Sequence, residues 1–455
     1  MIPIAQRLGA FASGITLKQV PQAVAEVARR CIVDVFGVTL AGLDTETGLA
    51  AQRVATAAYG SGLCRIPVSA CALPVAGAAQ VLGTAAHVWD YDDTFLEGIV
   101  HGSAAVWSAV AAMSQLCGLS GRQTLEAYIA GVETEYALGG VVTNKLFYRG
   151  WWPTGVLGAV GAAAGAARAL SLDATATTNA IAIAAAQAVG PRRLQGWPSK
   201  PWLCGRAAET GVLAALYARE GLTAPIDAFE HPFGFAALHN DGLLKPDALD
   251  DLGSRWRLVS PGVSLKLYPA CSSMQAATEA VLEIMREHRL DAADVAAVRC
   301  EVTELVEVSL VYNNPNSVAE AQFSMPFAIA CALKFGGFEL QHLNISTLRD
   351  PTVRAMFPKV QMVRFSGILA GPAAERDYPE GAAVALTTTA GRSYDRMNGI
   401  ATGMPGKPMP DAQLDRKFLN CAARSGISAP EASRLLESLR TIDSLRSMAA
   451  VFGSA

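Results

Sequence analysis

The chain has 455 residues, with 37 Lys and Arg against 40 Asp and Glu, which gives a formal net charge of −3. A chain of this length usually exceeds what a single hydrophobic core supports, so we expect two domains. The sequence has no basic run and no interleaving of basic with aromatic residues, which argues against a nucleic-acid partner. Its nine cysteines are scattered and never form a C-x-x-C pair, a pattern that argues against a disulfide framework or a structural zinc site.

The N-terminal segment and the apolar stretches favour a cytoplasmic protein without a membrane partner. Residues 1–7 lack the basic-then-apolar order of a signal peptide. The most apolar stretch, residues 156–167, is too short and too rich in glycine to span a bilayer. We therefore expect reduced thiols and a cytoplasmic location.

The first half of the chain, from about residue 20 to 225, has an almost wholly helical pattern. Small residues at this density let helices approach closely, as in a tightly packed all-α core. Ala-rich blocks between short Gly, Pro or Ser-Leu-Asp breaks predict helices over residues 21–42, 73–87, 103–117, 123–140, 153–170, 174–189 and 204–220.

The pattern changes near residue 260, after a loop-rich passage over residues 222–260. Apolar and polar residues alternate with a period of two in three segments, which predicts strands, and helical stretches lie between them. A Gly- and Pro-rich link over 403–410 then precedes a helical tail from Asp411. The predicted strands are 294–303, 360–365 and 382–389, and the predicted helices between them are 271–288, 318–335 and 341–348.

This order predicts a mostly α protein in which a large all-α helical domain receives an inserted smaller α+β domain. We expect the helical domain to comprise residues 1–262 and 405–455, and the inserted domain to comprise residues 263–404. The two crossings should lie at Pro261-Gly262 and at the 403–410 link, and a pocket should form at the domain interface.

The strongest functional signal is the segment His87–Thr94, which contains Asp90, Asp92 and Asp93 and is followed by His101. The chain is 51% hydrophobic and has only six histidines, so an apolar core would hold such groups only if they were paired, ligated or catalytic. The three aspartates cannot share one helix face, so we expect the segment to bend and to direct polar groups into a cleft. A helix N-cap is the alternative, but a cap needs only one aspartate.

Three further segments are candidates for substrate contact. Trp152 precedes a proline at a helix start, where backbone N–H groups can receive a carboxylate. Arg192, Arg193 and Lys200 lie in one loop and could clamp an anion. Cys271 stands at another helix start, where the helix dipole would lower the pKa of its thiol. The structural alternatives are packing for the tryptophan, a solvated loop for the basic residues and an inert cysteine.

Six motifs follow one another in a fixed order along the chain: His87-x-x-Asp90-x-Asp-Asp-Thr94, His101-Gly-Ser, Trp152-Pro-Thr, Lys200-Pro followed by Gly205-Arg-Ala-Ala, Lys266-x-Tyr-Pro-x-Cys271 and Glu320-Ala-Gln-Phe-Ser324. In this order they resemble the MmgE/PrpD family, which includes 2-methylcitrate dehydratase, cis-aconitate decarboxylase and iminodisuccinate epimerase. The resemblance covers nearly the whole chain. It implies a homodimer, an active site in the cleft between the helical and the α+β domain, and no cofactor or metal.

The resemblance implies active-site groups at Asp90, Thr94, His101, Lys200 and Lys266. Of these, we expect Asp90, His101 and Lys200 to be catalytic, and Thr94 and Lys266 to bind substrate.

Four positions depart from the family pattern. Trp152 and Gln275 stand where family members often carry histidine, and Phe327 stands where several carry tyrosine. Cys271 stands where the decarboxylase carries histidine and other members carry cysteine. One histidine of the usual set is therefore left, which weakens a decarboxylase assignment. We expect Cys271 to be catalytic, and Trp152, Gln275, Phe327 and Arg192 to bind substrate.

The chemistry that the resemblance implies is proton transfer beside a carboxylate, which needs a base with a pKa near neutrality and cations for the developing charge. His101, oriented by Asp90, is the expected base, and Lys200, Lys266 and an arginine of 192–193 are the expected cations. A hydro-lyase is the first choice. An epimerase or isomerase is the second, because a proton shift between two faces needs no leaving group.

Two other classes stay open. Asp92-Asp93 in an all-α domain would suit a magnesium-dependent isoprenoid-type enzyme, but no second metal motif follows it. A non-catalytic binding protein would explain the missing histidines. Magnesium-dependent activity would identify the isoprenoid-type enzyme. Proton exchange into a carboxylate ligand would exclude the non-catalytic binding protein.

Overall fold

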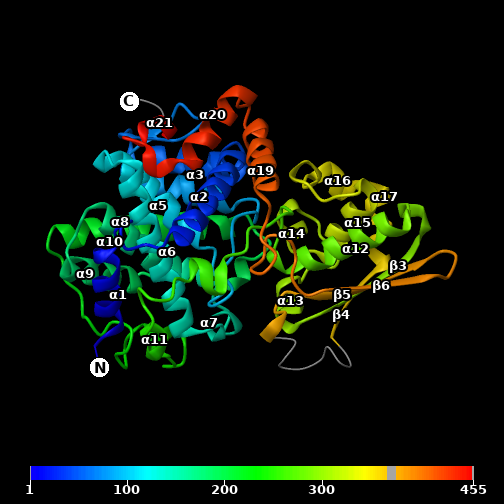
Figure 1. Cartoon of the computed structure of the whole chain (residues 1–455), viewed down its shortest axis with the longest axis horizontal. Helices are drawn as coiled ribbons and strands as arrows, with labels where there is room; N and C mark the ends of the chain where they lie inside the picture. The colour runs from blue at the N-terminus through cyan, green and yellow to red at the C-terminus, as the bar shows by residue number, and fades with distance from the viewer. Residues whose placement is uncertain (1, 366–375, 453–455) are drawn as a thin grey trace.

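The computed structural model describes residues 2–365 and 376–452 and consists mostly of α-helix with a smaller α+β portion, as the sequence predicted. Figure 1 shows a large helical unit, which holds both ends of the chain, beside a smaller unit that contains a sheet. The helical unit is defined below by α1–α11 and α19–α21, and the small unit by β3–β6 and α12–α17.

The N-terminal part of the helical unit contains all seven helices predicted between residues 21 and 220, with end points that differ by a few residues. The largest difference is at α10, which begins at Ser199 rather than at 204 and therefore includes Lys200. The helices are α1 (Ile4–Gly14), α2 (Gln22–Leu43), α3 (Glu46–Tyr59), α4 (Val75–His87), α5 (Gly102–Cys117), α6 (Gly121–Val142), α7 (Lys145–Tyr148), α8 (Pro153–Ala169), α9 (Ala174–Ala185), α10 (Ser199–Arg219) and α11 (Phe235–His239), and a short hairpin pairs β1 (Cys64–Arg65) with β2 (Ala72–Leu73).

Helices α4, α8 and α10 pack in direct backbone contact at the centre of this unit. A Cβ atom at Gly205 of α10 would lie 2.2 Å from the Gln80 carbonyl oxygen of α4, and one at Gly211 would lie 2.4 Å from the Cβ of Ala162 in α8. Only glycine fits at such distances. This close packing fixes the first turns of α8 and α10, where Trp152 and Lys200 lie.

The small unit is built on a four-stranded sheet in the order β4-β3-β5-β6. The strands are β3 (Val295–Val302), β4 (Val360–Arg364), β5 (Ala382–Thr388) and β6 (Ser393–Asn398), with β3 and β4 parallel and the other pairs antiparallel. Helix α12 (Gln275–His288) packs on β5 and β6, and α15 (Met325–Phe335) packs on β4. The shorter helices are α13 (Glu304–Ser309), α14 (Val318–Ala321), α16 (Ile345–Arg349) and α17 (Pro351–Arg354).

The small unit contains two short helices that were not predicted, α13 and α17, and it differs from the prediction at two further places. The predicted helix 318–335 is two helices, α14 and α15, because the hydroxyl of Ser324 accepts a hydrogen bond from the backbone N–H of Phe327 and starts a new helix there. Strand β6 was not predicted, because its edge position leaves its polar side chains partly exposed and obscures the alternation.

The chain returns to the helical unit after the small unit. Helices α19 (Asp411–Arg424) and α20 (Ala429–Arg440) pack on α2, and α21 (Ala449–Phe452) follows (Figure 1). The outgoing and returning crossings lie side by side, since the N–H of Leu265 donates to the carbonyl of Gly403 at 2.9 Å. Gly403 has φ 98, a left-handed conformation that glycine adopts freely. The boundaries at 262/263 and 404/405 themselves stay a prediction.

The buried ammonium group of Lys417 connects the C-terminal tail to the helical core and to the segment that leads into the small unit. Lys417 of α19 lies 2.6 Å from Oδ1 of Asp34 in α2, and it donates hydrogen bonds to the carbonyl oxygens of Tyr91 at 2.7 Å and Lys266 at 2.9 Å. Its side chain is only 3% exposed. The position of the tail is therefore coupled to the two segments that carry the polar cluster.

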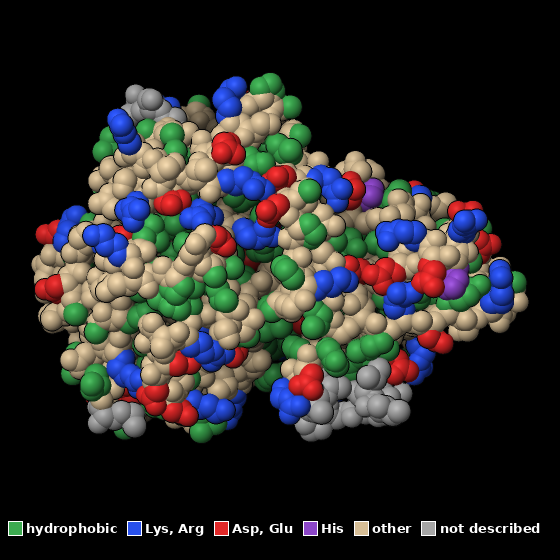
Figure 2. All heavy atoms as spheres, in the orientation of Figure 1, with side chains coloured by type: hydrophobic (Ala, Val, Ile, Leu, Met, Phe, Trp, Pro, Cys, Tyr) green, Lys and Arg blue, Asp and Glu red, His purple; other side chains and the backbone are tan. Residues whose placement is uncertain are grey.

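The surface in Figure 2 carries interspersed positive and negative side chains over both units, and it is notched at the lower edge where the units meet. Among the described helices, none combines the length and the apolar character needed to cross a bilayer.

We predict that Lys417→Met lowers the free energy of unfolding by about 3–5 kcal/mol, because it strips a buried carboxylate and two carbonyl groups of their common partner. Urea denaturation of wild type and variant measures this difference. Arg376→Ala, which removes an exposed ion pair with Asp377, is the control and should have no measurable effect. A Lys417→Met protein as stable as wild type would show that the ion pair does not hold the tail in place.

Candidate active site

A small cavity of about 40 Å³ lies between the two units. This volume accommodates a few water molecules and is too small for a tricarboxylate, so a substrate of that size requires the two walls to move apart. The wall from the helical unit consists of Asp90, Thr94, Ile99, His101, Phe147, Trp152, Gln195 and Lys200, and the wall from the small unit consists of Cys271, Ser272, Ser273, Leu305, Ser309, Phe323 and Glu380.

Four helices begin at this cavity. His101 is the N-cap of α5, Trp152 is the N-cap of α8, and Lys200 is the second residue of α10. Cys271 is the N-cap of a 3-10 turn over Ser272–Met274 that leads directly into α12. Helix N-termini carry partial positive charge and free N–H groups, so their convergence favours an anion in the cavity.

Asp90 lies between two lysines. Lys200 Nζ donates to Asp90 Oδ2 at 2.5 Å, and Lys266 Nζ donates to Oδ1 at 2.6 Å and to the backbone carbonyl of Asp90 at 2.7 Å. Burial by itself would raise the pKa of Asp90, but Lys200 and Lys266 hold it well below its usual range. The residue also has φ 47, a strained conformation that persists where the surroundings fix it. The expectation that Asp90 orients His101 was therefore wrong, because its oxygens bind lysines.

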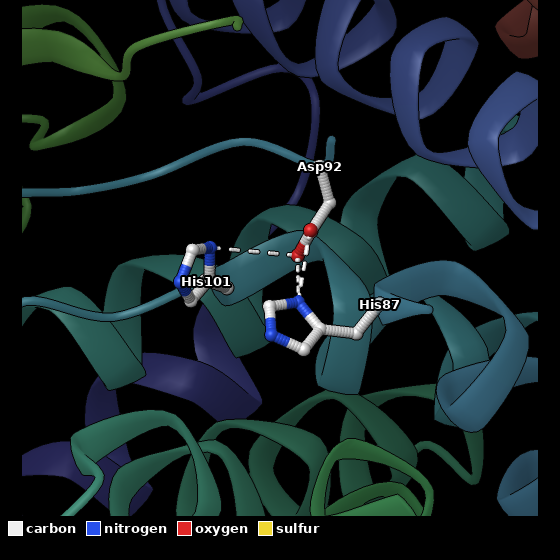
Figure 3. A group of neighbouring side chains, drawn as sticks. All are labelled: His87, Asp92 and His101. Atoms are coloured by element: carbon white, nitrogen blue, oxygen red, sulfur yellow. Dashed lines mark hydrogen bonds and ion pairs between the residues drawn. The ribbon is translucent and has the colours of Figure 1, made fainter. Parts of the chain in front are cut away.

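His87 extends this arrangement into a relay of hydrogen bonds. Lys200 Nζ also lies 2.5 Å from His87 Nε2, and His87 Nδ1 lies 2.9 Å from both carboxylate oxygens of Asp92. An ammonium group can only donate, so Nε2 of His87 accepts and Nδ1 carries the proton that is donated to Asp92. Figure 3 shows this contact, with the ring of His101 beside that of His87 and also directed at Asp92.

His101 is held as a neutral imidazole with one free nitrogen. Its Nδ1 lies 2.8 Å from the carbonyl oxygen of Asp93, which can only accept, so Nδ1 carries a hydrogen and Nε2 has the lone pair. Burial and the nearby Lys266 lower the pKa of His101 well below its ordinary value. Asp92 Oδ2, 3.5 Å from Nδ1, would stabilise the ring once it gains a proton.

His87, Asp92 and His101 offer potential metal ligands within 4.8 Å of one another. The tautomers described above place a hydrogen on each ring nitrogen that faces Asp92, whereas a metal ligand needs a lone pair there. Lys200 Nζ, at His87 Nε2, adds a positive charge beside the group. The arrangement therefore has the chemistry of a hydrogen-bond network rather than that of a metal site.

The structure brings most of the sequence-predicted residues to the cavity. Lys266 does not line it but lies behind Asp90, to which it is bonded. Cys271 does line it, but burial and Asp90 raise the pKa of its thiol to about 11, the opposite direction to the expected activation by the helix dipole. The predicted residues that line the cavity are Asp90, Thr94, His101, Trp152, Lys200 and Cys271.

Three predicted substrate contacts lie elsewhere. Arg192 donates to the carbonyl of Phe147 at 3.2 Å and stacks over its ring, one layer behind the wall. Gln275 accepts from the N–H groups of Leu267 and Tyr268, so it shapes the Lys266 segment instead of contacting the cavity. Phe327 is fully buried in the core of the small unit. Gln275 and Phe327 were assigned from family resemblance and Arg192 from the basic loop, and the side chains of all three have structural partners here.

The residue that sequence reasoning missed is Glu380, on the wall of the small unit. Its Oε1 accepts hydrogen bonds from the hydroxyls of Ser272 at 2.5 Å and Ser273 at 3.0 Å. The local sequence Asp377-Tyr-Pro-Glu-Gly381 indicates only a turn. Nothing in it signals that the carboxyl reaches a cavity built by segments distant in the chain.

Comparison with known proteins shows matches over most of the chain. The MmgE/PrpD N-terminal domain matches residues 6–245, and the MmgE/PrpD C-terminal domain matches residues 268–440. Human (Homo sapiens) cis-aconitate decarboxylase is 25% identical over 427 residues, which cover 89% of this chain and 85% of that protein. The mouse (Mus musculus) cis-aconitate decarboxylase is also 25% identical, over 89% of this chain and 84% of its own length.

We predict that His101→Asn lowers turnover by about 10²–10⁴-fold, the usual contribution of a positioned general base. Asparagine can still donate to the Asp93 carbonyl, so the fold should be kept while the free nitrogen is lost. Steady-state kinetics measure the effect, with the exposed His231→Asn as the matched control. Turnover at the wild-type level in His101→Asn would make His101 a structural residue.

Proposed function

Because the chain belongs to the MmgE/PrpD family, we propose that it is an acid–base enzyme that acts on a small di- or tricarboxylate without a cofactor, as a hydro-lyase of the 2-methylcitrate dehydratase type. The observation that carries the proposal is the free Nε2 of a neutral His101 in a cavity that Lys200 and four helix N-termini surround. A homodimer in the cytoplasm, inferred from the family resemblance and the cysteine pattern, completes the proposal.

Lys200 is suited to bind a substrate carboxylate. Its ammonium group has three N–H donors, of which one contacts Asp90 and one contacts His87, so a third is available toward the cavity. The charges of Lys200 and Lys266 are balanced by those of Asp90 and Asp92. The helix N-termini therefore supply the remaining positive potential for a bound anion.

In this proposal His101 Nε2 removes a proton from the carbon beside the substrate carboxylate. The electron pair of the broken C–H bond becomes part of an enediolate-like transition state, which Lys200 and the backbone N–H groups stabilise. Asp92 stabilises the imidazolium ion that forms. Loss of a β-hydroxyl group as water then gives the alkene product.

Decarboxylation is the second candidate, and the resemblance to cis-aconitate decarboxylases over nearly their full length favours it. Trp152 and Cys271 count against it, because tryptophan cannot transfer a proton as the histidine of the family pattern can, and Cys271 stands where the decarboxylase carries histidine. Epimerisation, in which the same carbon is reprotonated on its other face, uses the same base and also fits the site.

We predict that the protein catalyses incorporation of deuterium from heavy water into at least one member of a panel of citrate, 2-methylcitrate, cis-aconitate, malate and aspartate-derived dicarboxylates. Proton abstraction next to a carboxylate is common to the hydro-lyase and epimerase assignments. Mass spectrometry detects the label, and proton NMR distinguishes alkene formation from inversion at one carbon. Release of carbon dioxide from cis-aconitate would instead support the decarboxylase assignment. A panel with no labelling and no product would contradict the proposed enzyme class.

A further inference from the structure

On the wall of the small unit, only one of the two carboxyl oxygens of Glu380 has hydrogen-bond partners in the described structure. The residue is 3% exposed and lines the cavity. Its Oε1 accepts two hydrogen bonds, from Ser272 and Ser273, while Oε2 is buried without a hydrogen-bond partner in the described structure. Native proteins rarely leave a buried carboxyl oxygen unpaired, and such an atom in a cavity wall suggests that a ligand completes it.

We propose that Glu380 is a further catalytic residue, the general acid that donates a proton from Oε2 to the hydroxyl group that leaves the substrate. This inference rests on the proposed hydro-lyase function. It assigns a role to the wall that faces His101, on which Cys271 is the one residue that the sequence predicted to be catalytic.

The hydrogen bonds determine where the proton of a protonated Glu380 lies. Both serine hydroxyls donate to Oε1, so the acid hydrogen must be on Oε2, the atom without a partner. Burial raises the pKa of Glu380, which favours this protonated form. The hydrogen bonds from Ser272 and Ser273 and the charge of Lys266 oppose the increase, and Asp90 adds to it. The other titratable groups that line the same cavity are Asp90, His101 and Lys200 on the opposite wall and Cys271 on its own.

The surroundings of each titratable group in the cavity determine whether it can donate or accept a proton. Asp90 is ionised between its lysines, and the thiol of Cys271, with its pKa raised to about 11, is a poor proton donor. His101 is neutral and has its lone pair on Nε2, so at that atom it can only accept a proton. A base on one wall and a carboxylic acid on the other are what an elimination needs.

The elimination balances with these two groups. His101 Nε2 takes the proton from carbon, the C–H electron pair forms the double bond, and the C–O bond to the hydroxyl group breaks. The Oε2 proton of Glu380 joins that oxygen, so that water leaves. The products are the alkene, an imidazolium ion and the Glu380 carboxylate, and transfer of the imidazolium proton to the carboxylate through solvent restores both groups.

The test compares wild type with Glu380→Gln, using citrate and 2-methylcitrate as probes and Glu307→Gln, an exposed change in α13, as the control. We expect Glu380→Gln to lower kcat by about 10²-fold or more with little change in KM. Exchange of the substrate proton with heavy water should persist, because His101 is intact. The wild-type rate should fall as the pH rises through the raised pKa of Glu380, and the residual activity of the variant should lack this alkaline limb.

Infrared difference spectra make the test independent of turnover. At neutral pH the wild-type protein should show the carbonyl band of one protonated carboxylic acid that Glu380→Gln lacks and Glu307→Gln retains. A missing band, or a variant with turnover within about threefold of wild type, would overturn the inference, and so would loss of proton exchange in parallel with turnover. A wild-type protein that shows the band but neither exchanges protons nor turns over either probe would instead contradict the proposed function, and with it the acid role of Glu380.

Discussion

The carboxylate of Asp90 is buried, and its ionised form needs two ammonium groups at hydrogen-bond distance. Removing an ion from water costs several kcal/mol, which only close and well-oriented partners offset. Lys200 reaches Asp90 from the first turn of α10, and Lys266 reaches it from the segment that leads into the small unit. Lys417 then holds the carbonyl of Lys266 from the returning tail. The need to stabilise the Asp90 carboxylate therefore brings the helical core, the segment leading into the small unit and the C-terminal tail close to this residue.

The same charges determine what His101 can do. Lys266 helps to lower the pKa of His101, so the ring is neutral when a substrate binds, while Asp92 lies close enough to stabilise it after proton transfer. The lysines are balanced by Asp90 and Asp92, so the cavity gains its attraction for anions from helix N-termini. An environment of fixed dipoles needs little rearrangement during reaction, which is how many enzymes stabilise developing charge.

The two-walled site follows from the inserted arrangement. His101, the proposed base, and Lys200, the proposed anion-binding residue, belong to the helical unit, whereas Cys271, the two serines and Glu380 belong to the small unit. The cavity as described is too small for a tricarboxylate, so binding and release require motion between the units. The adjacent crossings at Leu265 and Gly403 are the places where such a motion would pivot.

Much of this architecture could be predicted from sequence because its signals are local. Alanine-rich blocks with Gly and Pro breaks specify the helices, and a cluster of charged residues in an apolar chain identifies the cavity. Side-chain direction could not be predicted in the same way. Gln275 and Phe327 occupy family positions, but local packing turns one toward the backbone and the other into the core. Glu380 was not predicted because a single glutamate in a turn belongs to no recognisable sequence motif, and its partners Ser272 and Ser273 are distant in sequence.

The proposed chemistry depends on His101 being a neutral imidazole with its hydrogen on Nδ1. NMR of the protein with isotopically labelled histidine nitrogens, assigned with His101→Asn, measures this directly. At neutral pH we expect the His101 signals of an uncharged ring with hydrogen on Nδ1 and a lone pair on Nε2, and we expect the ring to gain a proton only below the ordinary histidine pKa of about 6.5. A charged imidazolium at neutral pH, or hydrogen on Nε2, would contradict it.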